Sequence, residues 1–71
     1  MDVRSEIDAT VWKIEVTAGD EVAADDVLLI LECMKMEVPV PAPVAGRVRS
    51  IAVAEGASVR EDDVLVVLDR G

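Results

Sequence analysis

Lys35 stands inside the stretch ECMKMEVPV, between Met34 and Met36, with Glu32 and Glu37 just outside the two methionines. A free lysine amine is mostly protonated at neutral pH, and it becomes a nucleophile only where a neighbouring group removes its proton. The chain contains no histidine, the residue that most often does this near neutral pH. The chain therefore has no base of its own to activate this lysine, and we expect it not to modify itself.

Each of these residues also has a purely structural interpretation. A lysine in a hairpin turn, as Lys35 would be, is commonly just solvated, and Glu32 and Glu37 would then be solvated charges at strand ends. Cys33 is either a reactive thiol beside the lysine or, as free cysteines more often are, a small hydrophobic side chain. No second acidic group converges on Glu32 in the sequence, so we expect no acid–base pair and no catalytic residue.

Other residues of chemically useful types are expected to have structural roles. Trp12, the only aromatic residue, is expected in the core or at half-buried surface rather than as a cofactor platform. Gly19, Gly46 and Gly56 are expected to be turn residues, and none belongs to a glycine-rich phosphate-binding pattern. With no histidine and one cysteine, the chain lacks the usual metal ligands, and no metal site is predicted.

An internal repeat organises the elements that must position Lys35. Residues 10–32 match residues 47–69 at a constant offset of 37, including an unbroken Asp-Asp-Val-Leu in the same register. The matched pairs include Val11 with Val48, Ile14 with Ile51, Val16 with Val53, Gly19 with Gly56, Val22 with Val59 and Leu31 with Leu68. The halves are therefore expected to share one plan and to be joined by a tight hairpin, residues 33–37, with Lys35 at its tip.

Each half is predicted to consist of short strands separated by two turns. In the first half Trp12, Ile14 and Val16 alternate with polar residues, which is the periodicity of a strand. Turns are expected where glycine or paired aspartates interrupt the pattern, at 18–20, 25–26, 55–57 and 62–63. Each half closes with a nearly continuous apolar strand, VLLIL or VLVVL, which predicts burial on both faces.

Neither half can bury a core alone, so the two are expected to pack together about a pseudo-twofold axis. The predicted fold is all-β, a flattened barrel-sandwich of two four-stranded antiparallel sheets in which residues 1–71 form a single domain. The predicted core consists of Val27, Leu28, Ile30 and Leu31 with Val64, Leu65, Val67 and Leu68. Pro39, Pro41 and Pro43 fall on one side of an alternating strand, which predicts a sheet edge.

Composition and charge limit the possible partners. The formal charge of −8 disfavours nucleic acid and anionic membrane surfaces, and the longest apolar run, VLLIL, is too short to cross a membrane. A single cysteine excludes an intramolecular disulfide, and the opening residues MDVRSEIDA contain no apolar signal-peptide segment. We expect a soluble, cytoplasmic protein that is monomeric as an isolated domain and has no nucleic-acid or membrane partner.

The stretch Glu-Cys-Met-Lys-Met-Glu, residues 32–37, resembles the Glu-(Ala/Ser)-Met-Lys-Met-Glu signature of biotinyl domains, the carrier modules of biotin-dependent carboxylases. The resemblance covers nearly the whole chain, and Ala-Gly-Asp-Glu-Val at 18–22 is similar to the family's turn after its second strand. It implies that Lys35 is biotinylated by a biotin protein ligase. It also implies that the chain carries carboxyl groups between a biotin carboxylase and a carboxyltransferase.

Departures from the family pattern leave the Met-Lys-Met triplet intact. Cys33 stands where the family usually has Ala or Ser, and Ala9 where it often has glycine. Asp25 and Asp62 occupy positions that are glycine in many members. Aspartate is among the residues that best tolerate a positive φ, so these turns are still expected to form.

Three functions remain open for the chain. It is a biotin carrier, a lipoyl carrier of a 2-oxo acid dehydrogenase-type system with lipoate as cofactor, or an unmodified interaction module. Lipoyl domains usually carry Asp-Lys-Ala, so Met34 and Met36 argue for biotin, and their soft side chains suit a ligase pocket. Glu32 and Glu37 would steer the ligase. A free-standing carrier is expected, although an excised domain would have the same sequence.

Overall fold

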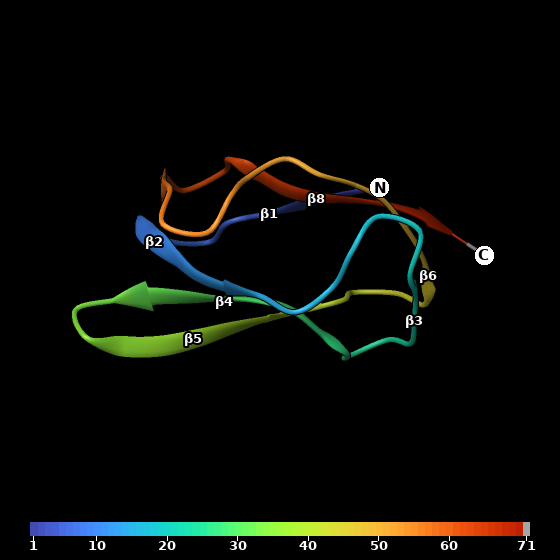
Figure 1. Cartoon of the computed structure of the whole chain (residues 1–71), viewed down its shortest axis with the longest axis horizontal. Helices are drawn as coiled ribbons and strands as arrows, with labels where there is room; N and C mark the ends of the chain where they lie inside the picture. Colours follow the sequence, from blue (N-terminus) through green and yellow to red (C-terminus); the bar gives the residue numbers. More distant parts are fainter. Residues whose placement is uncertain (71) are drawn as a thin grey trace.

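Two four-stranded antiparallel sheets make up the protein, with no helix in the described residues (Figure 1). The computed structural model describes residues 1–70, so Gly71, the last residue of the predicted domain, lies outside them. The sheet orders are β1-β8-β6-β3 and β5-β4-β2-β7, which confirms the predicted architecture. The strands are β1 (Asp2–Arg4), β2 (Ala9–Ile14), β3 (Glu21–Val22), β4 (Val27–Cys33), β5 (Met36–Pro41), β6 (Gly46–Ile51), β7 (Ser58–Val59) and β8 (Val64–Arg70).

Equivalent strands of the repeat occupy equivalent places in the two sheets. A shift of 37 residues carries β2, β3 and β4 onto β6, β7 and β8, and carries β1 onto residues 39–41 of β5. Backbone hydrogen bonds repeat at the same offset: the Ser5 N–H donates to the Asp63 carbonyl at 2.9 Å, and the Ala42 N–H to the Asp26 carbonyl at 2.8 Å. The repeat is therefore longer than the sequence predicted, since β1 already belongs to it.

The predicted turns use residues that tolerate a left-handed backbone. Gly19 has a φ of 100° and Gly56 a φ of 87°, values that side-chain-bearing residues rarely adopt. Asp25 and Asp62 both have a φ of 74°. In each case the following aspartate accepts a hydrogen bond of 2.9 Å from the backbone N–H three residues before it. Paired aspartates thus perform two jobs, one supplying the conformation and the other closing the turn.

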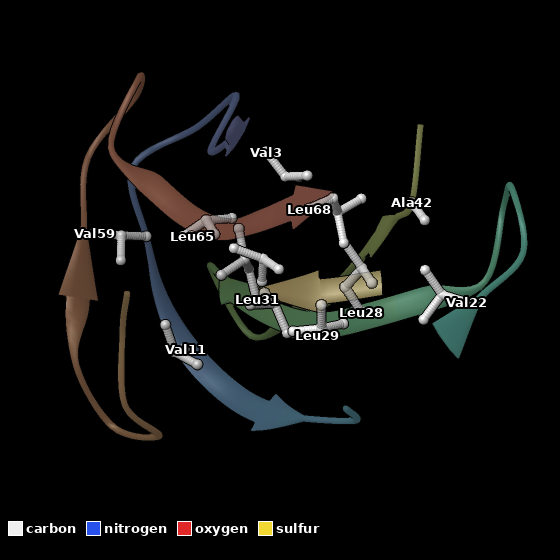
Figure 2. Close-up of a cluster of buried hydrophobic side chains, with 12 residues drawn as sticks. Val3, Val11, Val22, Leu28, Leu29, Leu31, Ala42, Val59, Leu65 and Leu68 are labelled. Carbon is white, nitrogen blue, oxygen red and sulfur yellow. The ribbon is translucent and has the colours of Figure 1, made fainter. Parts of the chain in front are cut away.

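The core lies between the sheets and is wholly aliphatic (Figure 2). Leu28 and Leu31 of β4 converge on Leu65 and Leu68 of β8, and none of these four side chains is more than 1% exposed. These are repeat-related pairs, so the two halves contribute equivalent residues to one core. The prediction for these four leucines is confirmed.

The rest of the predicted core is wrong because β4 and β8 do not alternate regularly. Val27 is 39% exposed, and Ile30 is only partly buried, while Leu29 is fully buried. The pairing of β4 with β5 passes from Val27 and Pro41 directly to Leu29 and Val40, so Leu28 is an extra residue in a bulge. A bulge shifts the inward-facing set by one residue. The second half repeats this change, with Val64 and Val67 partly buried and Val66 in the core.

A second irregularity changes the strand predicted around Trp12. The pairing of β2 with β4 passes from Val11 to Lys13, so Trp12 is the extra residue there. Trp12 is 48% exposed, so of its two expected positions the half-buried surface is the one observed, and the neighbouring Val11 is in the core. β2 ends at Ile14 rather than continuing through Val16, although Ile14 and Val16 both pack against the core as the alternation implied.

Gly46 is not a turn residue. It begins β6 and pairs with Val22 on one side and Arg70 on the other. A Cβ at this position would collide with the backbone carbonyl oxygen of Asp69. Glycine is therefore needed for a close approach of two strands, which is a different reason from the positive φ of the turn glycines.

The molecule is elongated, with extents of 34 × 17 × 17 Å. Figure 1 shows the β4–β5 hairpin at one end of the long axis and the last residues of β8 towards the other. No helix in the described residues is long and apolar enough to cross a membrane. The hairpin tip and the end of β8 thus lie far apart along the molecule.

Candidate functional site

Lys35 lies in the turn that joins β4 to β5 at one end of the molecule (Figure 1). β4 ends at Cys33 and β5 begins at Met36, so the loop consists of Met34 and Lys35 alone, shorter than the predicted hairpin of 33–37. Met34 has a φ of 52° and Lys35 a φ of 65°. Two successive positive φ values are typical of the type I′ turn, whose twist matches that of a two-residue hairpin.

The residues in this turn are poorly suited to it. Type I′ turns strongly favour Asn-Gly or Asp-Gly, and a left-handed backbone costs other residues roughly 1–2 kcal/mol each. Met34 and Lys35 nevertheless both adopt it. Nothing in their residue types signals this conformation, so the sequence did not predict it. Backbone strain of this kind concentrates at functional sites.

The side chains at the tip are open to solvent. Met34 is 90% exposed and Met36 is 68% exposed, more than any other large hydrophobic residue in the described part of the chain. Lys35 is exposed as well, and within residues 1–70 it forms no ion pair. Core packing explains neither methionine, whereas soft apolar surface on both sides of a free amine suits a partner's pocket.

Two glutamates stand behind the tip on neighbouring strands. Glu32 and Glu37 face each other directly across the β4–β5 pair, and both are exposed. Like charges placed directly opposite destabilise a sheet, so this arrangement does not serve stability. Cys33 pairs with Met36, is partly buried and lies outside the core cluster, so its thiol is neither a core residue nor fully open.

Lys13, the other lysine, has a very different setting. It lies within β2, where its backbone pairs with Ile30 of β4, and its Nζ atom is 3.5 Å from a carboxylate oxygen of Glu15. A partner enzyme would have to detach a central strand to bend the backbone around Lys13. The structure therefore separates the two lysines, one at a protruding turn and one within a sheet.

The other features that could take part in binding or chemistry lie away from the tip. The described residues contain no group of three or more histidine, cysteine, aspartate or glutamate side chains placed to hold a metal ion. Trp12 lies at the surface of β2 rather than in the core. A groove between β1 and β5, which the sequence did not predict, does not include Lys35 among its lining residues.

A family model described as "Biotin-requiring enzyme" matches residues 2–68. The chain belongs to the biotin/lipoyl attachment family. A protein from Mycobacterium leprae strain TN named "Biotinylated protein TB7.3 homolog" is 45% identical over 67 residues, which cover 94% of each chain. The "Biotin/lipoyl attachment protein" of Bacillus subtilis strain 168 is 40% identical over 68 residues, covering 96% of this chain and 93% of its own.

Other relatives in the biotin/lipoyl attachment family are much larger proteins. The dihydrolipoyllysine-residue acetyltransferase component of the pyruvate dehydrogenase complex from Azotobacter vinelandii is 39% identical over 67 residues, covering 94% of this chain but 10% of its own. In solved structures, Kluyveromyces lactis urea carboxylase matches with a TM-score of 0.92 and 33% identity, over 97% of this chain. A single-chain, multi-domain long-chain acyl-CoA carboxylase matches with a TM-score of 0.94 and 31% identity, over all of it.

The match to the two carboxylases is confined to a small part of each. This chain spans 6% of the urea carboxylase and 7% of the acyl-CoA carboxylase. It is thus a biotin/lipoyl attachment domain, similar to the carrier domains of biotin-dependent carboxylases.

Proposed function

We propose that this protein is a biotin carrier and that Lys35 is the residue to which biotin is attached by a biotin protein ligase. The observation that carries the proposal is the position of Lys35 in a two-residue turn between two strongly exposed methionines. A lysine there can enter another enzyme's active site together with its backbone. Membership of the biotin/lipoyl attachment family supplies the chemical class of the attached group.

The ligase supplies the base and the activated acyl group. Nζ of Lys35 gives up a proton, attacks the activated carboxyl carbon of biotin and forms an amide bond as the activating group leaves. Met34 and Met36 offer apolar surface to the ligase on both sides of the reacting amine. Glu32 and Glu37 present two adjacent negative charges to basic groups on it.

Attached biotin supplies a group that can take up and release a carboxyl group. The chain contributes a lysine tether at one end of a molecule 34 Å long. A group held this way meets the active sites of a biotin carboxylase and a carboxyltransferase at high effective concentration. The chain itself is expected to catalyse no step.

Lipoate is the second candidate cofactor. It is supported by the relatedness of this chain to the dihydrolipoyllysine-residue acetyltransferase component. The two exposed methionines favour biotin, because the family resemblance places Asp and Ala at these positions in lipoyl domains. The two cofactors differ in mass, so one measurement separates them.

The proposal is tested by incubating the purified chain with a biotin protein ligase, ATP and biotin. We expect Lys35→Arg to abolish labelling, because a guanidinium stays protonated and is not acylated. The matched control Lys13→Arg should be labelled like the unaltered chain. Streptavidin detection and peptide mass mapping report the site, and parallel incubation with a lipoate ligase and lipoate reports cofactor choice. Labelling that survives Lys35→Arg would contradict the proposal.

A further inference from the structure

A groove separates the free edges of the two sheets. β1 is one of the two edge strands of its sheet, and β5 is one of the two edge strands of the other. The groove between them has a volume of about 840 Å³, which is within the range of protein ligand sites. Its apolar lining includes Val3, Leu31, Val38 and Val40. This groove is distinct from the lysine at the hairpin tip, which is not among its lining residues.

The two edges differ in the hydrogen bonds that their backbones can donate. In β5, Pro39 and Pro41 carry no N–H, so this edge cannot donate to an added strand at these positions. The repeat places Asp2 and Arg4 of β1 at the equivalent positions, 37 residues earlier. Both of these residues have an N–H, so β1 retains the donors that β5 has lost.

The hydrogen bonds of β1 show which way these donors point. Met1 exchanges backbone hydrogen bonds with β8, and the Ser5 N–H also donates towards β8, to Asp63. Backbone groups of successive residues in a strand point to opposite sides. Asp2 and Arg4 therefore direct their N–H and C=O groups away from β8, towards the groove. No strand of the described chain pairs with this side of β1.

The charge around the groove favours a basic occupant. Five carboxylates line it, against one guanidinium and the Met1 ammonium, which donates to the Leu68 carbonyl: Asp2, Glu6, Asp25, Glu61 and Asp62, with Arg4 and Met1. The guanidinium is already engaged, since Arg4 Nη1 donates to the Asp62 carbonyl at 2.8 Å and Nη2 to the Asp2 carboxylate at 3.2 Å. A second copy of this acidic chain would bring like charges together, whereas a basic segment would complement them.

We propose that β1 accepts an extended segment rich in lysine or arginine, supplied by a partner protein, as a fifth strand of its sheet. The segment bonds to the backbone of Asp2 and Arg4, and its basic side chains meet the carboxylates around the groove. The short, charged β1 repels other copies of this chain, and the prolines of β5 leave that edge without donors. Of the two edges that border the groove, β1 is therefore the one that can accept a strand. This interaction does not depend on modification of Lys35.

The probe is the acetylated and amidated peptide Lys-Val-Lys-Val-Lys-Val, titrated into the isotopically labelled chain and followed by amide NMR. We expect shifts and slowed hydrogen exchange at the amides of Asp2 and Arg4, weakening as salt is raised. The peptide Glu-Val-Glu-Val-Glu-Val should not bind. Lys-Pro-Lys-Pro-Lys-Pro, which has the same charge and fewer donors, should bind at least about tenfold more weakly.

Paired substitutions separate the backbone donors from the side chains. Arg4→Pro and Asp2→Pro each remove one N–H, and the fold accommodates proline at the repeat-equivalent positions, Pro41 and Pro39. Each proline variant should bind the lysine peptide about tenfold more weakly than the matching Arg4→Ala or Asp2→Ala variant, which keeps the N–H. Circular dichroism shows whether each variant is folded. If one proline variant does not fold, the comparison at the other position still tests the proposal.

Four results would overturn the proposal. They are no binding at millimolar peptide, equal affinity of the proline and alanine variants, shifts confined to the β4–β5 hairpin, and concentration-dependent pairing of the chain with itself through β1. Because the test uses the unmodified chain, failure of the Lys35 proposal does not change its outcome.

Discussion

The two lysines of this chain have the same chemistry and different settings. Lys35 is held in a turn between exposed methionines, whereas Lys13 lies within a paired strand with Glu15 beside its ammonium. Neither has a histidine nearby, since the chain has none. They differ in their access to a partner enzyme. The backbone at Lys35 forms a protruding turn, whereas the backbone at Lys13 is paired within a sheet.

The residues beside Lys35 should decide which cofactor it receives. We expect Met34→Asp combined with Met36→Ala to reduce biotin transfer and to admit lipoate, because the change recreates the lipoyl-type triplet and removes the exposed apolar surface. Intact mass after separate incubation with the biotin and lipoate ligases measures both effects. The matched control is Val27→Ala, which trims an exposed apolar residue of β4 that lies away from the tip. Unchanged biotin transfer in the double variant would show that the ligase does not recognise the two methionines.

At the scale of the element, the hairpin and the aspartate turns use the left-handed backbone for different purposes. Asp25 and Asp62 tolerate it well and lie in turns closed by neighbouring carboxylates. Met34 and Lys35 tolerate it poorly and lie in the tip that carries the proposed site. The left-handed backbone therefore lowers the stability of the chain at the hairpin tip more than at the aspartate turns.

Replacing a strained residue with glycine should separate stability from function. Met34→Gly is expected to raise the stability of the chain by about 1 kcal/mol, because glycine adopts a φ near 52° without steric strain. It should also reduce biotin transfer by removing the exposed side chain. Asp25→Gly should give a smaller gain and leave transfer unchanged. Urea denaturation and a labelling assay test both variants, and a loss of stability in Met34→Gly would rule out strain at the tip.

The close strand approach at Gly46 makes a second prediction at this scale. Gly46→Ala should destabilise the chain by about 1–3 kcal/mol, because its Cβ would meet the backbone carbonyl of Asp69 and force the strands apart. Ala9, the residue at the equivalent place in the first half, already carries a Cβ. Ala9→Gly should therefore cost no more than about 1 kcal/mol. Equal effects in thermal unfolding would show that the two halves pack alike at this point.

At the scale of the whole molecule, the repeat accounts for both the sheets and the core. Each half supplies equivalent strands, and the fully buried leucines come from β4 and β8 in matching positions (Figure 2). A body of this size has little stability to lose, since small domains bury limited apolar surface. The two halves must therefore fold as one unit.

Leu31 and Leu68, which the repeat makes equivalent, should contribute to stability alike. Each side chain is 1% exposed or less, so Leu31→Ala and Leu68→Ala should each lower the free energy of unfolding by about 2–5 kcal/mol. The control is Ile30→Ala, which should lower it by less because Ile30 is only partly buried. Urea denaturation followed by circular dichroism gives the three values. A midpoint that does not move in either leucine variant would contradict a shared core.

The sequence by itself determined the all-β class, the duplicated plan, and the turns at Gly19, Gly56 and the paired aspartates, and it pointed to Lys35 as the proposed attachment site. These features depend on local residue types and on an offset of 37 that needs no coordinates. Only the tertiary structure showed that Val27 and Trp12 face outward, because the bulges at Leu28 and Trp12 shift the inward-facing set by one residue. Alternation in a sequence cannot locate an extra residue whose existence depends on the partner strand.

The role of Gly46 and the open edge of β1 were also decided only in three dimensions. Gly46 is required by an Asp69 carbonyl that lies 23 residues further along the chain, and no local pattern records that distance. The groove lies between two edge strands, β1 and β5, of which only β5 contains proline. Such surfaces depend on which strands pair and in which register, and these pairings join residues that are far apart in the sequence.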